Sequence, residues 1–169
     1  VVVAPGSYEE NIVVAGKSGI LVSFAGPDSS IINGMGAQTM MSQGGFWMID
    51  GFTFVGGSAV DGGAMLNVDG GLMVGHSIFI ENNAEYNGGA VAAINSTVFM
   101  DSVMFIGNNA NNDGGALFVQ NSIQNPDGQW FVALGNTMIA QNTSGNQGAG
   151  LYVNAFDEGN TYVDLFNTN

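Results

Sequence analysis

DGGAM (Asp61 to Met65), NGGAV (Asn87 to Val91) and DGGAL (Asp113 to Leu117) are three copies of one motif, and their spacing decides the fold. Each copy follows the previous one after 26 residues, and a degenerate copy, QGAGL (Gln147 to Leu151), follows after 34. A unit of this length cannot bury its apolar residues alone. Repeats of this kind therefore stack into a solenoid with a continuous core.

A second motif keeps the same spacing. FIENNA begins at Phe79, FIGNNA at Phe105 and IAQNTS at Ile139. Phe79, Phe105 and Ile139 should therefore lie above one another in an inward column, together with Phe54 of the first copy. The fourth residue of each segment is asparagine. We expect Asn82, Asn108 and Asn142 to form an amide ladder in which each side chain satisfies turn groups of its neighbour.

Composition favours strands over helices, because the chain has 27 glycines and each glycine inside a helix costs about 1 kcal/mol relative to alanine. We predict an all-β, right-handed parallel β-helix with about six rungs, a rung being one turn of the solenoid, and three short strands per rung. Residues 1–169 should form a single domain. It would comprise an entry rung at 1–34, repeat rungs at 35–166 and a loop inserted near 122–129, where Pro126-Asp127-Gly128 is a turn signal.

The paired glycines have a physical role in such a fold. They permit φ > 0 and close backbone approach where the chain turns sharply between strands. The turn glycines are Gly62, Gly63, Gly88, Gly89, Gly114 and Gly115.

Many residues that alternate with the expected core positions are also apolar. Contiguous exposed apolar columns usually mark an interface. A register error of one residue would exchange these positions with the core, so that alternative stays open. The candidate interface comprises Met48, Met73, Phe99, Ile78, Met104, Met138, Phe118 and Tyr152.

Two further segments extend the pattern to nearly the whole chain. Pro5-Gly6-Ser7-Tyr8-Glu9-Glu10-Asn11 and Ile31-Ile32-Asn33-Gly34 resemble the entry rung of pectin-lyase-like β-helix proteins. The GGA[ILV] and FxxN alternation resembles the repeats of polymorphic outer-membrane proteins. That resemblance implies a secreted, surface-associated or adhesive β-helix.

The charge balance excludes several partners. Fourteen acidic residues face one basic residue, Lys17, and the formal net charge is −13. Nucleic-acid binding needs a basic surface that neutralises phosphates, so we expect none. No apolar run reaches the roughly 18 residues of a membrane-spanning helix, so we expect no membrane insertion by this segment. We expect no cofactor and no metal site, although the Asp-Gly pairs leave Ca²⁺ as an alternative.

Enzymatic activity is the less favoured interpretation. Lyases of this fold use Arg or Lys as the base. This chain has no Arg, and its one Lys, Lys17, is expected in a turn of the entry rung. A polysaccharide hydrolase would use Asp50 and Asp101, expected at neighbouring corner positions, with His76 at the same corner. His76 is expected to align with Asp50, Ser102 and Asn136, where a small polar residue also suits a structural turn.

We therefore expect an extracellular or cell-surface structural module rather than an enzyme. It should be adhesive and should associate with copies of itself, or with another surface protein, into a fibre or layer. The alternative is a glycan-binding or polysaccharide-hydrolysing β-helix.

Overall fold

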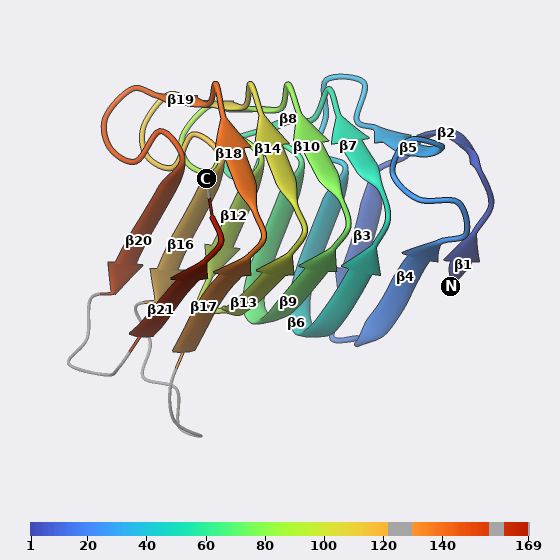
Figure 1. Ribbon diagram of the computed structural model, residues 1–169, viewed down its shortest axis with the longest axis horizontal. Helices are drawn as coiled ribbons and strands as arrows, with labels where there is room; N and C mark the ends of the chain where they lie inside the picture. The colour runs from blue at the N-terminus through green and yellow to red at the C-terminus, as the bar shows by residue number, and fades with distance from the viewer. Residues whose placement is uncertain (122–129, 156–160, 169) are drawn as a thin grey trace.

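The computed structural model describes residues 1–121, 130–155 and 161–168, and the expected inserted loop at 122–129 lies outside the described residues. Over these ranges the chain contains strands and turns and no helix. The strands wind into a parallel β-solenoid (Figure 1). It has about four turns. No described helix is long and apolar enough to cross a membrane. The predicted all-β solenoid class is confirmed.

Three parallel sheets run along the solenoid. The large, 11-stranded sheet comprises β1 (Val2–Val3), β3 (Ile12–Ala15), β4 (Gly19–Ser23), β6 (Met40–Asp50), β9 (Met65–Gly75), β12 (Val91–Ile94), β13 (Thr97–Asp101), β16 (Leu117–Asn121), β17 (Trp130–Gly135), β20 (Leu151–Ala155) and β21 (Thr161–Phe166). The six-stranded sheet comprises β2 (Gly6–Glu9), β5 (Ser30–Asn33), β7 (Thr53–Val55), β10 (Ile78–Ile80), β14 (Met104–Ile106) and β18 (Met138–Ala140). The four-stranded sheet comprises β8 (Ser58–Ala59), β11 (Asn83–Ala84), β15 (Asn109–Ala110) and β19 (Thr143–Ser144).

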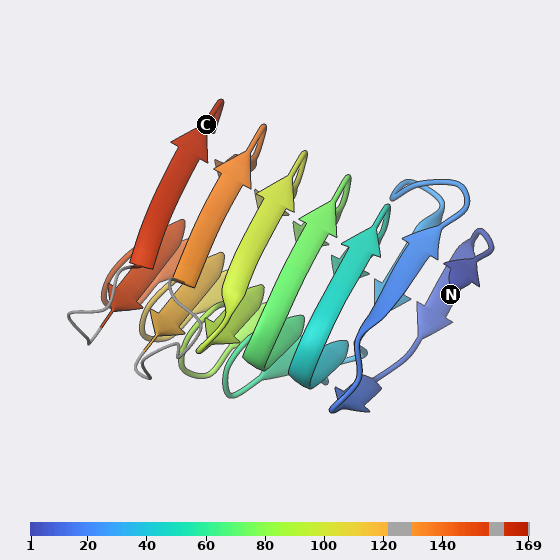
Figure 2. The same cartoon turned by 90° about the horizontal axis from the view of Figure 1, so that it is seen from below.

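The large sheet bends in the middle and so supplies two sides of the solenoid. In β9 the bend falls at Asp69, which has a φ of 54°, and in β6 it falls at Gly44 and Gly45, with φ values of 69° and 81°. In the following rung the bend separates β12 from β13. One half, which includes β12, β16 and β20, follows the GGA motif, and the other, which includes β13, β17 and β21, precedes the six-stranded sheet. Figure 2 shows the strands of this second half lying side by side along the solenoid.

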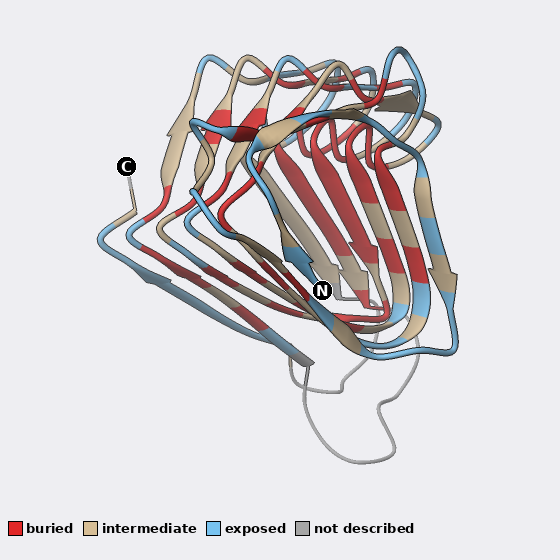
Figure 3. Ribbon diagram, turned by 90° about the vertical axis from the view of Figure 1, so that its right-hand side faces the viewer, coloured by how far each residue is buried: buried red, intermediate tan, exposed pale blue. Residues whose placement is uncertain are grey.

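The core lies inside the coil because side chains alternate between its interior and its exterior along every strand. Figure 3 shows that buried residues recur along the strands of successive rungs. Phe54, Phe79 and Phe105 are all fully buried and stack with ring centroids 4.9 and 5.1 Å apart. Strand pairing aligns each with the next, as the repeat predicts, and Ile139 follows Phe105.

The solenoid has about four turns, slightly fewer than the six rungs expected. A rung also carries a fourth strand, the two-residue strand of the four-stranded sheet, in addition to the three expected. The number of turns is lower because the segment on the N-terminal side of the repeats does not form complete four-sided turns. There β2 runs into β3 through Glu10 and Asn11, without a GGA segment and without a strand of the four-stranded sheet. Only the four GGA-type repeats provide the fourth side.

Residues 1–34 pair directly with the repeats. β4 pairs with β6, and β5 pairs with β7, in parallel register. The entry segment therefore continues the same sheets and shares their core, with Leu21 and Ile32 buried.

Candidate functional site

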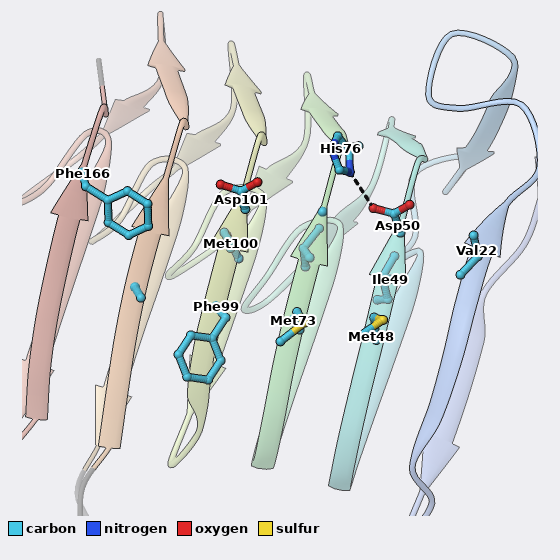
Figure 4. Close-up of a pocket in the computed structure, with 13 residues that line it drawn as sticks. Val22, Met48, Ile49, Asp50, Met73, His76, Phe99, Met100, Asp101 and Phe166 are labelled. Carbon is cyan, nitrogen blue, oxygen red and sulfur yellow. Dashed lines mark hydrogen bonds and ion pairs between the residues drawn. The ribbon is translucent and has the colours of Figure 1, made fainter.

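A groove of about 410 Å³ crosses the outer face of the large sheet, on the half that precedes the six-stranded sheet (Figure 4). Its floor is a row of outward side chains from successive strands, and strand pairing aligns Met48 with Met73, Met73 with Phe99, and Phe99 with Ala133. These side chains are half-buried because each packs against its neighbours in the row. Val22 lines the groove on β4 and Phe166 lines it on β21.

The rim of the groove carries its polar side chains, Asp50, His76 and Asp101. Nδ1 of His76 lies 2.9 Å from Oδ1 of Asp50, and both side chains are accessible, with exposed fractions of 68% and 39%. Oδ1 of Asp101 accepts a hydrogen bond from Nδ2 of Asn136 at 2.8 Å. The structure therefore brings all three candidate catalytic residues to one edge.

The expected alignment of these residues was wrong by one position. Asp50 pairs with Gly75 rather than with His76, and Asp101 pairs with Gly75 from the other side. The two aspartates are thus two rungs apart, separated by a glycine, and are not neighbours. His76, Ser102 and Asn136 follow the paired column by one residue, at a corner where each has a positive φ, of 42°, 57° and 48°.

Glycines in the rim column make room for the side chains beside them. A methyl group on Gly75 would lie 2.5 Å from Oδ1 of Asp50, and one on Gly135 would overlap the ring of Phe166. Positions with a side chain therefore alternate with glycines along the column, in the order Asp50, Gly75, Asp101, Gly135 and Phe166. Sequence reasoning missed both glycines and Phe166. The column has unequal intervals, of 25 residues from Asp50 to Gly75, 26 to Asp101 and 34 to Gly135, so one fixed spacing does not reveal the alternation.

No family model, curated protein or solved structure matches this chain. The groove must therefore be interpreted from its own chemistry.

The hydrogen bond that His76 donates to Asp50 is the main cause that raises the pKa of His76. The negative charges of Asp50 and then Asp101 add to this effect, and burial opposes it. Asp50→Asn should therefore lower the pKa of His76 towards the ordinary value of about 6.5. Asp101→Asn is the matched control, since it removes only the weakest cause and should lower the pKa less. His76 is the single histidine of the chain, so a pH titration of its ring protons by NMR measures this directly. Equal shifts in the two variants would contradict the assigned pairing.

The asparagine ladder occupies the turns between the six-stranded and four-stranded sheets. Nδ2 of Asn82 donates to Oδ1 of Asn108 at 3.0 Å, and Nδ2 of Asn108 donates to Oδ1 of Asn142 at 2.9 Å. Each amide also donates to a backbone carbonyl of the preceding rung, and Oδ1 of Asn108 accepts the backbone N–H of Asn82. Asn82 and Asn108 are buried, so these bonds satisfy groups that water does not reach.

The two glycines of each GGA motif have different structural roles. The first has a left-handed backbone, with φ of 63° at Gly62, 65° at Gly88 and 67° at Gly114. The second needs space: a methyl group on Gly63, Gly89 or Gly115 would overlap carbonyl groups of the next rung. Sequence reasoning assigned both properties to the pair without separating them.

The candidate interface residues divide between three faces. Met48, Met73 and Phe99 form the groove floor, and Ile78, Met104 and Met138 align on the outside of the six-stranded sheet. Phe118 does not belong to an exposed column, because only 4% of it is exposed. Its ring stacks on the half-buried Tyr152 with centroids 5.6 Å apart, and the backbone of Gly114 folds back against it.

The aspartates of the Asp-Gly pairs, which left Ca²⁺ binding as an alternative, lie at separate turns. Oδ1 of Asp61 accepts the backbone N–H of Asn87, Oδ1 of Asp69 accepts Nδ2 of Asn95, and Oδ1 of Asp113 accepts Nδ2 of Asn146. Asp127 lies outside the described residues. Within the described ranges, no three His, Asp or Glu side chains converge as metal ligands would.

Proposed function

We propose that this chain is an extracellular structural or adhesive β-solenoid that associates with copies of itself. The observation that carries the proposal is the exterior of the six-stranded sheet. We call it the outer apolar face, and it comprises Thr53, Val55, Ile78, Ile80, Met104, Ile106, Met138 and Ala140. Strands β5, β7, β10, β14 and β18 contain no charged residue, although the chain as a whole carries a net charge of −13.

A continuous apolar surface loses free energy when it is removed from water, by about 25 cal/mol per Å². Its side chains are only half-buried in the single chain, so further burial is available to them. A second copy is the favoured partner because its own outer apolar face offers the same flat, uncharged surface. Acidic groups elsewhere repel each other, so added salt should strengthen the association by screening that repulsion.

The sequence resemblance supports the same proposal. The GGA[ILV] and FxxN repeats resemble those of polymorphic outer-membrane proteins, and the entry segment resembles that of pectin-lyase-like β-helices. That resemblance favours a cell-surface location and an adhesive role.

Sedimentation velocity at increasing protein concentration tests the proposal. The wild-type chain should sediment increasingly fast, whereas Met104→Lys should stay monomeric because it places a charge in the outer apolar face. Val13→Lys is the matched control: Val13 is 71% exposed on β3, away from that face, and its variant should associate like the wild type. A wild-type chain that remains monomeric at every concentration, or a Met104→Lys variant that associates equally well, would refute the proposal.

Polysaccharide hydrolysis or glycan binding is the second candidate, and the groove rim favours it. Asp50 and Asp101 stand two rungs apart, roughly 9.6 Å at the usual strand spacing, close to the separation of about 6.5–9.5 Å in inverting glycosidases. Against it, only three of the 13 lining residues offer a polar side chain, whereas a sugar needs many hydrogen bonds. Polysaccharide turnover that disappears in Asp101→Asn would favour this candidate.

A further inference from the structure

The groove combines an apolar floor with an acidic rim, and the two features together restrict what it can accept. Figure 4 shows Met48, Met73 and Phe99 on adjacent strands, with Asp50 and Asp101 further along the same strands. We propose that the groove binds an extended segment of a partner protein in which Lys or Arg side chains are flanked by apolar residues. This goes beyond self-association, which uses a different face.

The floor suits apolar side chains of varied shape. Met48 and Met73 have flexible, polarisable thioethers that adapt to irregular surfaces, and Phe99 offers a ring. The short side chain of Ala133 leaves space in the row between Phe99 and the β21 strand. Phe166 limits the groove at that end, and its ring, like that of Phe99 in the floor, can contact both aliphatic groups and cations.

The rim favours a cationic ligand. Asp50 is 39% exposed, and His76 is its one ion-pair partner among the described residues. Asp101 accepts hydrogen bonds from Ser102 and Asn136, both neutral, so its negative charge is not neutralised by them. The net charge of −13 extends this preference, because it draws cations towards the whole molecule. A copy of this chain cannot supply the complement, since Lys17 is its single basic residue.

The spacing of the two carboxylates suits an extended segment that runs across the strands. Two rungs correspond to roughly 9.6 Å. In a polyproline II segment, residues three apart project from the same side about 9.3 Å apart. Basic residues at positions i and i+3 would therefore reach Asp50 and Asp101 together, with the apolar residues between them on Met73 and Phe99.

Fluorescence anisotropy with a labelled peptide of sequence Pro-Lys-Leu-Pro-Lys-Leu-Pro, blocked at both ends, tests the proposal at low salt. The wild-type chain should bind it, and the Asp50→Asn/Asp101→Asn variant should bind it about three- to tenfold more weakly, as expected for two exposed ion pairs. The control variant Asp28→Asn/Glu85→Gln removes the same charge at two exposed positions outside the groove and should bind almost as tightly as the wild type. A Met73→Ala variant should also bind more weakly.

Three results would overturn the proposal. The first is equal weakening in the groove and control variants, which would show that only the overall charge matters. The second is equally tight binding of a peptide with norleucine in place of both lysines. The third is binding of a neutral oligosaccharide such as cellopentaose, lost in the groove variant, with no binding of the peptide to the wild type. Thermal unfolding of each variant, followed by circular dichroism, confirms that the compared proteins are folded.

Discussion

Phe79→Ala is expected to lower the free energy of unfolding by about 3–5 kcal/mol. Phe79 is fully buried and stacks between Phe54 and Phe105, with interplanar angles of 11° and 12°. Truncation removes the ring from the centre of a continuous stack. Both neighbouring rings then border a cavity that they cannot fill, because strand pairing on each side holds their backbones in register.

Urea denaturation followed by circular dichroism measures this loss. Phe24→Ala is the matched control, since Phe24 is 79% exposed and its truncation should change stability by less than about 0.5 kcal/mol. If the two variants unfolded at the same urea concentration, the phenylalanine stack would not be a major part of the core.

Gly89→Ala is the second large effect, with an expected loss of about 3 kcal/mol or more. Gly89 has an ordinary φ, so its backbone would tolerate alanine. The added methyl group, however, would overlap the carbonyl oxygen of Gly115 in the next rung and lie 2.5 Å from the carbonyl oxygen of Asn109. Both obstacles are backbone atoms, so no change of side-chain rotamer can relieve the overlap.

Gly107→Ala separates this steric effect from backbone strain. Gly107 has a φ of 64°, and its methyl group would meet only the flexible side chain of Glu81, at 3.9 Å. That variant should lose about 1–2 kcal/mol, the cost of a left-handed alanine. Thermal melts of the two variants give the comparison, and a smaller loss for Gly89→Ala than for Gly107→Ala would contradict the close approach of the rungs.

The repeat made the register of the strands predictable. Residues at equal positions in successive copies must pair, so the inward column of Phe54, Phe79 and Phe105 follows from the spacing of two short motifs. The ladder of Asn82, Asn108 and Asn142 follows in the same way, since stacked turns bring identical amides within hydrogen-bonding distance.

Other features depended on detail that the repeat does not encode. Which outward residues are exposed depends on how the turns fold back, so the burial of Phe118 beneath the Gly114 turn could not be read from alternation. The one-position error at the groove rim arose because the interval between β6 and β9 is 25 residues, as in the pairing of Met48 with Met73, and not the 26 of the next interval. Asp50 and His76 nevertheless touch. A side chain that leans over the glycine of the next rung can reach a residue one position further along.

The absence of cysteine from the chain makes a direct test of the central claim possible, which is that the outer apolar face joins copies of the protein. A nitroxide spin label is attached through Ala140→Cys, on the outside of β18, and in a second sample through Val13→Cys on β3. Electron paramagnetic resonance spectra are then recorded as the protein concentration rises. The account predicts that the label at position 140 becomes immobilised and its lines broaden, while the label at position 13 stays mobile. Unchanged mobility at position 140 in samples that contain oligomers would contradict the account, because the copies would then meet through another surface.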